Sequence, residues 1–501
     1  MNVFHDLLYG FGIVFQPWNL LSCFFGVFVG TLVGVLPGIG PAGAMSMLLP
    51  ITFGISPVTG IIMLAGIYYG AMYGGSTTSI LVNIPGEAAS VVTCLDGYQM
   101  ARKGRAGPAL GIAAFGSFIA GTLGLIGLMI LSNPLASVAL LFGPAEYFSL
   151  MCLGLSLVTY LTQGSVLRGL AMAGMGLFLS LIGQDLITGQ ARFTFGLTGL
   201  IDGVGLVPLV MGLFGISEVL LNLEKLDEKR EVLKTRFKNL FPTKGDWQKS
   251  TVAIGRGTLI GFFLGILPGG GAVISSFISY AVEKRFSKHP EEFGKGAIEG
   301  VAGPESANNA ASSSGFIPLF SLGIPANVIM ALLLGALMIH GLKPGPLLIT
   351  EHPEIFWGTV ASMYVGNIML LVLNLPLIGI WVQVLKVPYR MLFPLILLFC
   401  FIGAYSISTN IFDLYVMLIF GVLGYVLRKL TYEPAPLVLA FVLGPMLEKN
   451  LRQALILSDG SLHVFLTRPL SAASLLISLF LLLSALLPSL QKRRRAVISE
   501  E

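Results

Sequence analysis

Long apolar segments recur along almost the whole chain, and they restrict its fold more than any other feature. At about 20 residues per crossing, they support roughly ten to fourteen membrane helices. Hydrophobic residues make up 55% of the 501 positions and charged residues only 11%, whereas soluble domains carry roughly 25% charged residues. The segments also lack the alternation of polar and apolar residues that is typical of membrane β-barrel strands. The sequence therefore predicts an all-α polytopic membrane protein and excludes a water-soluble globule.

The polar residues exclude several classes of function. The 30 Lys and Arg residues lie mainly at the ends of apolar segments, so they indicate membrane topology and no nucleic-acid partner. The four cysteines stand singly, without the spacing of metal or redox sites. The chain has no zincin motif, no nucleophile-elbow motif and no P-loop. We therefore expect no enzyme activity, no bound cofactor and no metal beyond a coupling ion.

A single long polar stretch divides the chain into two halves. It runs from Glu224 to Ser250 and carries eight Lys and Arg residues, which the positive-inside rule places in the cytoplasm. We expect a first membrane repeat over residues 1–223, this basic linker over 224–250 and a second membrane repeat over 251–448. A periplasmic loop, an extra C-terminal helix and a basic cytoplasmic tail are expected over residues 449–469, 470–490 and 491–501.

The two halves share two motifs in the same order. Gly26–Gly40 aligns with Gly257–Gly271 without a gap, and each segment has a glycine at every fourth position followed by Leu-Pro-Gly. A second pair, Gly75–Pro85 and Gly315–Pro325, also aligns without a gap and ends in Ile-Pro. This agreement indicates an internal duplication of a membrane unit. We interpret the spaced glycines as packing positions, because small residues let helix backbones approach closely.

The charged residues indicate that the second unit is inverted relative to the first. The first unit has Arg102, Lys103 and Arg105 after its Ile-Pro motif and no basic residue at positions 50–57, whereas the second unit has the opposite distribution. Two inverted-topology repeats with a periplasmic N-terminus place the linker and the C-terminal tail in the cytoplasm. Few basic residues then lie outside, namely Arg192, Lys343, Lys449, Arg452 and Arg468.

Each Leu-Pro-Gly motif interrupts its helix, since proline removes a hydrogen-bond donor and glycine permits a positive φ. A half-helix that restarts at such a break offers free N–H groups to an anion, and paired breaks in two repeats point to a transporter's substrate site. The alternative is a re-entrant turn that binds nothing. The candidate substrate-binding residues at the breaks are Pro37, Gly38, Ile39, Gly40, Pro268, Gly269, Gly270 and Gly271.

Polar side chains also cluster around the second shared motif. Hydroxyls and amides at this density are costly in a membrane unless they face one another, water, ions or substrate. As the lining of a substrate path, the candidates are Ser76, Thr77, Thr78, Asn83, Ser312, Ser313, Ser314 and Asn327. The alternative is hydrogen bonding between helices, which stabilises by only about 0.6 kcal/mol per contact.

Glu305 is an acid that the first unit lacks, since Ala65 stands at the aligned position. An isolated carboxylate in an apolar stretch is costly to ionise unless a cation or a hydrogen-bond donor compensates it. We expect Glu305 to hold a coupling cation or to carry a coupled proton, with Asn308 and Asn309 supplying neutral oxygens. The alternative places Glu305 in a solvated cytoplasmic vestibule. The residues do not choose between Na⁺ and H⁺.

Three classes of membrane protein compete for this pattern. A secondary transporter accounts for the duplication, the paired breaks and the polar clusters at matching positions. A channel needs no inverted duplication of broken helices, and a membrane-embedded enzyme needs a nucleophile with its base or a metal triad. The sequence therefore favours secondary transport.

Several stretches rich in Gly, Ser and Asn are long enough to identify a family. They are Gly34–Pro41, Tyr69–Ile80, Asn83–Glu87, Gly265–Gly271 and Gly303–Asn309. Through these motifs nearly the whole chain resembles the large membrane subunit of the bacterial tripartite tricarboxylate transporters (TctA-like). The resemblance implies a multi-pass protein of the bacterial inner membrane with about twelve transmembrane helices.

The resemblance also implies partners and an activity. Such a subunit works with a small membrane subunit and a periplasmic solute-binding protein. It imports citrate or other small carboxylates by symport with Na⁺ or H⁺, without ATP hydrolysis. The missing P-loop agrees with this expectation.

Overall fold

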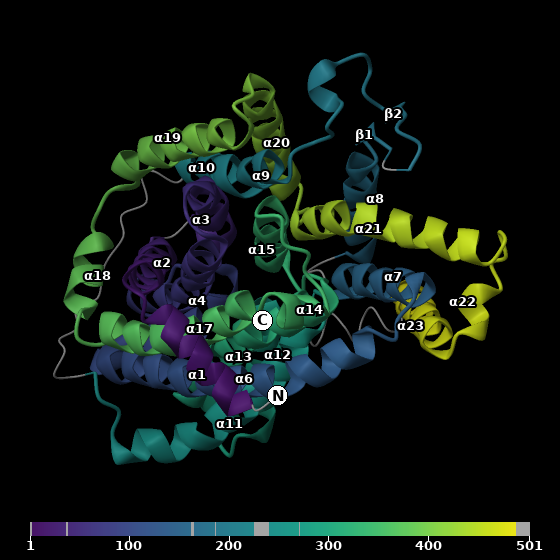
Figure 1. The fold of residues 1–501 in the computed structure, drawn as a ribbon. Coiled ribbons are helices and arrows are strands. Elements are labelled where there is room, and N and C mark those ends of the chain that lie inside the picture. Colours follow the sequence, from purple (N-terminus) through teal and green to yellow (C-terminus); the bar gives the residue numbers. More distant parts are fainter. Residues whose placement is uncertain are drawn as a thin grey trace.

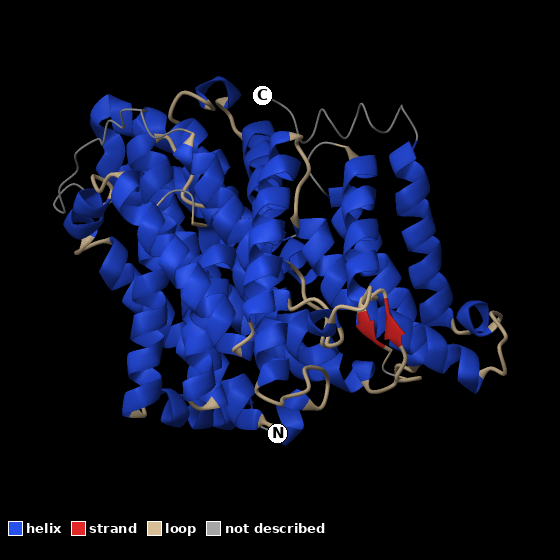
Figure 2. Ribbon diagram, turned by 90° about the horizontal axis from the view of Figure 1, so that it is seen from above, coloured by secondary structure: helices blue, strands red, loops and turns tan. Residues whose placement is uncertain are grey.

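The computed structural model describes residues 3–36, 39–161, 165–185, 187–224, 240–269 and 271–486. Regular structure in these residues is helical except for one short antiparallel hairpin, in which Gly183 pairs with Arg192 and Gln184 with Ala191. Figure 2 shows many of the long helices side by side with roughly aligned axes. The predicted all-α architecture is confirmed in this general form.

The elements of the first half precede the polar linker. They are α1 (Val3–Val14), α2 (Pro17–Val35), α3 (Gly40–Leu48), η1 (Leu49–Gly54), α4 (Pro57–Val82), η2 (Ala88–Ser90), α5 (Val91–Met100), η3 (Ala101–Arg105), α6 (Ala106–Ala139), α7 (Pro144–Leu161), α8 (Val166–Ser180), β1 (Gly183–Gln184), β2 (Ala191–Arg192), η4 (Thr198–Leu200), α9 (Leu206–Val210), η5 (Met211–Ile216) and α10 (Ser217–Leu223).

The elements of the second half follow the linker. They are α11 (Lys244–Ile266), α12 (Gly271–Phe286), η7 (Pro290–Glu292), α13 (Glu299–Ser314), α14 (Phe316–Leu322), α15 (Val328–Ile339), α16 (Leu348–Glu351), α17 (Pro353–Asn374), α18 (Ile378–Val384), α19 (Tyr389–Ser408), α20 (Ile411–Lys429), α21 (Ala435–Leu457), α22 (Val464–Thr467) and α23 (Pro469–Leu486).

Seven helical segments of the described chain are long and apolar enough to cross a membrane. They are Pro17–Val35, Pro57–Val82, Ala88–Ala139, Leu206–Leu223, Pro353–Asn374, Tyr389–Ser406 and Ile411–Lys429. Shorter apolar helices accompany them at Val3–Val14, Pro144–Thr159, Val166–Ser180, Val328–Ile339 and Pro469–Ser484. These segments indicate a multi-pass membrane protein, and the expected number of about twelve crossings stays a prediction.

Helices α4 and α13 form the centre of the bundle. Every residue from Thr59 to Val82 of α4 and from Gly300 to Ser314 of α13 is buried. Figure 1 shows these helices in the middle of the molecule, with α18 and α19 on one side and α7, α21 and α23 on the opposite side. Because these helices are buried, we expect most of their many hydroxyl and amide groups to bond to one another or to backbone carbonyls.

The two glycine rows bring α2 onto α4 and α11 onto α13. A Cβ added to any of these glycines would lie between 2.0 and 2.4 Å from an atom of the facing helix. The glycines concerned are Gly26, Gly30, Gly34, Gly257, Gly261 and Gly265. No side chain larger than hydrogen fits at these distances, so the packing interpretation of the glycines is confirmed.

The two units repeat the same order of elements around their breaks. After the breaks, α3 restarts at Gly40 and α12 restarts at Gly271. Further along each unit, a buried stretch of helix ends in a left-handed residue just before Ile-Pro, which is Asn83 in the first unit and Gly323 in the second. This correspondence agrees with a duplication, whereas the inverted orientation of the second unit stays a prediction.

Two segments expected as connections contain helix. Residues 225–239 of the linker lie outside the described residues, but Thr243 and Asp246 form a capping box that starts α11 at Lys244. The segment expected as a periplasmic loop contains the end of α21, which continues to Leu457, and α22. An ion pair of 2.7 Å between Glu448 and Arg452, one helical turn apart, supports this continuation.

Candidate substrate cavity and buried polar crossing

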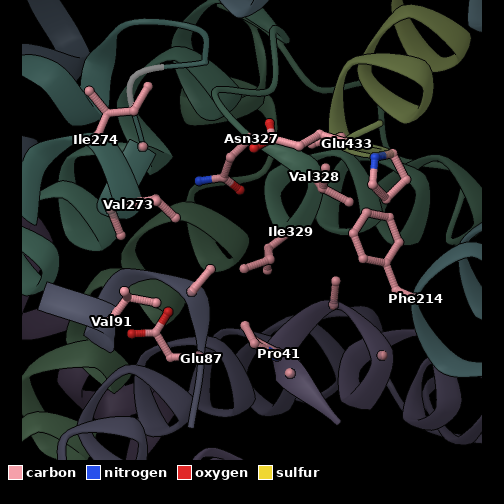
Figure 3. A pocket seen from close by; sticks show the side chains of 18 of the residues that line it. Pro41, Glu87, Val91, Phe214, Val273, Ile274, Asn327, Val328, Ile329 and Glu433 are labelled. Carbon is pink, nitrogen blue, oxygen red and sulfur yellow. The ribbon is translucent and has the colours of Figure 1, made fainter. Parts of the chain in front are cut away.

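The two helix breaks meet at one cavity of about 850 Å³. The start of α3 and the segment from Pro85 to Val91 line it from the first unit, and the starts of α12 and α15 line it from the second. Figure 3 shows Pro41, Glu87 and Val91 on one side of this space and Val273, Asn327 and Ile329 on the other. The sequence-predicted residues that line the cavity are Ile39, Gly40, Gly269, Gly271 and Asn327.

Four helices begin at this cavity. The first residues of α3, α12, α15 and α21 all line it. The N-cap residues of α3 and α21, Ile39 and Pro434, make no side-chain capping hydrogen bond, whereas Asn327 caps α15 by accepting a 2.9 Å hydrogen bond from Met330 N–H. Helix starts without a side-chain cap leave backbone N–H groups for another acceptor. The cavity is therefore suited to an anion.

Backbone contacts hold the second break in position. Gly269 has a φ of +80° and donates a 2.8 Å hydrogen bond from its N–H to the carbonyl of Ala326. A Cβ added at Gly269 would lie 2.6 Å from Val158 Cα of α7. Gly40, at the first break, also has a positive φ, of +65°, but faces open space. The Ile-Pro turn and α7 thus hold the second break tightly in position. At the first break, glycine is favoured at position 40 only because the backbone there has a positive φ.

Glu87 is a buried acid of the cavity wall. Its Oε2 atom accepts a 2.6 Å hydrogen bond from Ala89 N–H, while Oε1 is buried and has no hydrogen-bond partner within the described part of the chain. On the opposite wall, Asn327 donates a 3.2 Å hydrogen bond to the hydroxyl of Tyr68. Glu87 belongs to one of the family motifs of the sequence but is not among the predicted site residues.

Charged residues of α8, α10 and α20 also line the cavity, and sequence analysis did not place them there. Arg428 forms an ion pair with Glu218. The exposed Arg168 lies 5.4 Å from the ring centroid of Tyr432 and donates to the carbonyl of Thr431 at 3.5 Å. The sequence signal for this part of the cavity wall is the segment 431–436, in which polar residues are followed by prolines, as is typical of a helix start.

Glu305 lies at a second polar centre, where α4, α5 and α13 cross. Its side chain is fully buried, which excludes the solvated vestibule. Ser76 donates a 2.6 Å hydrogen bond to Oε2, and Thr93 donates to Oε1. The carboxylate of the second unit is therefore held by hydroxyls of the first.

The asparagines predicted beside Glu305 bond mainly to neighbouring oxygens. Asn309 Nδ2 donates to Ser117 Oγ at 2.7 Å, to the Glu305 carbonyl at 3.0 Å and to Asn308 Oδ1 at 3.1 Å. Asn308 Nδ2 is buried without a hydrogen-bond partner among the described residues. These side chains join α13 to α6, which carries Ser117.

The remaining candidates lie apart from the large cavity. Ser312 and Ser313 donate to the Asn309 carbonyl and Ser314 to that of Ala311, so all three bond back to their own helix. Thr78 donates a 2.6 Å hydrogen bond to the carbonyl of Val35, and Asn83 is an exposed helix end. Pro268 packs close to Gly154 of α7, and Ser76 and Thr77 face a separate small cavity. Pro37, Gly38 and Gly270 lie outside the described residues.

A membrane helix bundle in which two interrupted helices meet at one cavity is typical of secondary transporters. The chain matches the tripartite tricarboxylate transporter TctA family over residues 20–439. It belongs to this family, whose members are transporter subunits rather than enzymes.

Two relatives from Agrobacterium vitis extend this comparison. The chain is 54% identical, over the full length of both proteins, to an uncharacterized 52.8 kDa protein in the TAR-I ttuC′ 3′ region. It is 56% identical over 241 residues to an uncharacterized protein in the TAR-II ttuC′ 3′ region, which covers 48% of this chain and all of that protein. No solved structure matches the chain.

Proposed function

We propose that the chain is the substrate-carrying membrane subunit of a carboxylate importer of the bacterial inner membrane. The observation that carries the proposal is the convergence of four helix starts on one cavity of about 850 Å³. That volume lies within the usual range of small-molecule sites, about 300–1,000 Å³. Substrates of the citrate type, with several carboxylate groups, suit a cavity that offers backbone N–H groups from several directions.

The charges around the cavity support coupling to a cation. Two arginines and three glutamates line it, namely Arg168, Arg428, Glu87, Glu218 and Glu433. The side chains of the wall carry no excess of positive over negative charge, so the helix starts alone attract the anion, and a cation or a proton that enters with it offsets its charge. This charge distribution favours symport with Na⁺ or H⁺, which requires no ATP.

The strength of helix-dipole binding explains the need for partner proteins. Each helix start stabilises an anion by about 0.3–1 kcal/mol at an exposed site, so four starts of this strength give roughly 1–4 kcal/mol, which corresponds to a dissociation constant of about 1 mM or weaker. A site this weak gains from a periplasmic solute-binding protein that captures the carboxylate at low concentration. A small membrane subunit completes the tripartite system.

Uptake in reconstituted vesicles tests the proposal. The chain is reconstituted with its small membrane subunit and its binding protein, and labelled citrate and smaller carboxylates are offered with and without a Na⁺ or a proton gradient. We expect gradient-dependent accumulation of at least one carboxylate, and none with the chain left out. Accumulation that ignores both gradients, or a carboxylate flux without the chain, would contradict the proposal.

The inverted topology predicts which surfaces face each compartment. With all four native cysteines replaced, we expect a membrane-impermeant thiol reagent added to intact spheroplasts to label Ser461→Cys and to spare His289→Cys. Both positions are exposed on the protein surface, and the positive-inside rule puts the first in the periplasm and the second in the cytoplasm. Labelling of His289→Cys before the membrane is permeabilised would rule out inverted repeats.

The same orientation opens the large cavity to the cytoplasm, because the exposed Arg168 lies on its wall.

A further inference from the structure

A second, much smaller cavity lies where α4, α6 and α17 pack together. Its volume of about 10 Å³ is close to the minimum that a single water molecule needs. Tyr73, Ser76, Thr77, Ser117 and Asn374 contribute polar side chains to its lining, and α6 closes it with apolar residues. All five of these polar side chains lie on helices buried in the membrane bundle, and the exposed fraction of Asn374 is 5%. The space is thus large enough for one water molecule or one bare ion.

Asn374 leaves an oxygen without a partner at this cavity. Its Nδ2 atom donates a 2.9 Å hydrogen bond to the carbonyl of Leu370, one turn earlier in α17. This bond fixes the orientation of the amide, since only the nitrogen can donate. The Oδ1 atom is then the free end, and it is buried with no hydrogen-bond partner in the described residues. A buried carbonyl oxygen in this condition destabilises the fold unless something binds it.

The hydroxyl protons around the cavity are directed elsewhere. Ser76 donates its proton to Glu305 Oε2 at 2.6 Å, and Tyr73 donates its proton to Asn367 Oδ1 at 2.6 Å. Ser117 accepts from Asn309 Nδ2 at 2.7 Å. With these protons used, the side-chain oxygens of Tyr73, Ser76 and Asn374 in the cavity lining have only acceptor capacity left. A cluster of acceptors beside a carboxylate attracts a cation and repels an anion.

We propose that this cavity binds one Na⁺ ion. Neutral oxygens with a single acid nearby suit a hard monovalent cation, whereas divalent ions demand several carboxylates. The ion compensates Glu305 through the shared Ser76 hydroxyl, so neither charge is buried alone. Na⁺ is the smaller ion and lets the surrounding oxygens approach it more closely than K⁺, which is about as large as the water molecule that the space just admits, so Na⁺ is bound more strongly.

The same ion links the two sites of the molecule. Ser76 lies about one turn beyond Met72, and Met72 lines the large cavity from the same helix, α4. An ion that ties α4 to α6 and α17 therefore fixes one wall of the substrate cavity. This coupling role rests on the proposed function, whereas the binding of Na⁺ does not.

Ion binding by the purified protein tests the site without transport. The protein in lipid nanodiscs is titrated with NaCl, with KCl or choline chloride keeping the ionic strength constant, and both thermal unfolding and bound ²²Na⁺ are measured. We expect saturable stabilisation by Na⁺ alone, with a stoichiometry near one. In Asn374→Leu, and independently in Thr77→Val, the Na⁺ concentration for half-maximal stabilisation should rise about tenfold or more.

Asn450→Leu is the matched control. Asn450 of α21 makes the same bond to a carbonyl one turn earlier, that of Met446 at 2.7 Å, and it does not line the cavity. Its Na⁺ response should equal that of the parent. If the parent shows no Na⁺-specific response, or if Asn374→Leu and Thr77→Val both keep the parent's response, the cavity holds only water and the inference is wrong. Na⁺ binding without any carboxylate uptake would instead reject the proposed function and leave the ion site in place.

Discussion

Replacing Gly269 with alanine is expected to abolish carboxylate uptake and to leave the protein inserted in the membrane. Alanine at a φ of +80° costs about 1–2 kcal/mol. Its Cβ would also lie 2.6 Å from Val158 Cα and 3.0 Å from Val158 N, so backbone must move. The break is tied to Ala326 by a hydrogen bond, so a shift of Gly269 displaces the start of α12 from the substrate cavity. We expect uptake to fall at least about 100-fold, since displacements of this size disrupt positioning.

Gly460→Ala separates backbone strain from the contact with α7. Gly460 has a φ of +81° in the turn after α21, and nothing lies within 4 Å of an added Cβ. This variant should carry the same strain and transport like the parent. Membrane insertion and detergent extraction of both variants, compared with their initial uptake rates, provide the measurement. A Gly269→Ala protein that inserts normally and transports at the parent rate would show that the second break is only a kink. Gly38, the glycine at the equivalent position of the first break, lies outside the described residues.

The repeating features of this fold were predictable because they are local in sequence. A glycine every fourth position marks one helix face, and Leu-Pro-Gly marks an interruption whatever the surroundings. Both interpretations needed only spacing and backbone chemistry. The facing partners, such as Gly303 opposite Gly257, follow once two such helices pack.

The composition of the substrate cavity was only partly predictable, because it depends on distant segments. Ile39 and Gly269 line it as expected, but Arg168 and the start of α21 reach it from other parts of the chain. A single sequence does not show which distant segments lie next to each other in the fold. Arg168 fits the general pattern of Lys and Arg residues at the ends of apolar segments, and that pattern does not indicate what the side chain faces.

Hydroxyl-rich stretches were the least predictable part of the site. Sequence alone cannot separate a serine that lines a path from one that bonds to its own helix, because both occur in polar stretches of buried helices. Ser312 and Ser313 bond back to Asn309 of their own helix, whereas Ser76 reaches across to Glu305. The difference arises from which neighbouring helix packs against each face.

Replacing Glu305 with glutamine is expected to eliminate gradient-driven uptake and to preserve the exchange of substrate across the membrane. Glutamine keeps the shape of the side chain, its oxygen can still accept from Ser76 or Thr93, and its amide can donate to the other hydroxyl. The fold should therefore persist. Without the negative charge, an ion beside Ser76 would be buried without compensation, which disfavours its binding strongly.

Two comparisons make the Glu305 experiment decisive. Glu299→Gln removes an acid from the first turn of the same helix, outside the hydrogen bonds described around Glu305, and should leave ion dependence unchanged. Glu305→Ala removes the acceptor of Thr93 and leaves Ser76 only the distant carbonyl of Met72, at 3.5 Å. A lost acceptor of a buried hydroxyl costs about 1–3 kcal/mol, so this variant should lower the unfolding temperature, which glutamine should not. Counterflow of labelled substrate measures exchange, and accumulation under an imposed ion gradient measures coupling. If Glu305→Gln accumulates substrate with the parent's ion dependence, the carboxylate has no part in coupling, and its hydroxyl contacts serve only to join the two repeats.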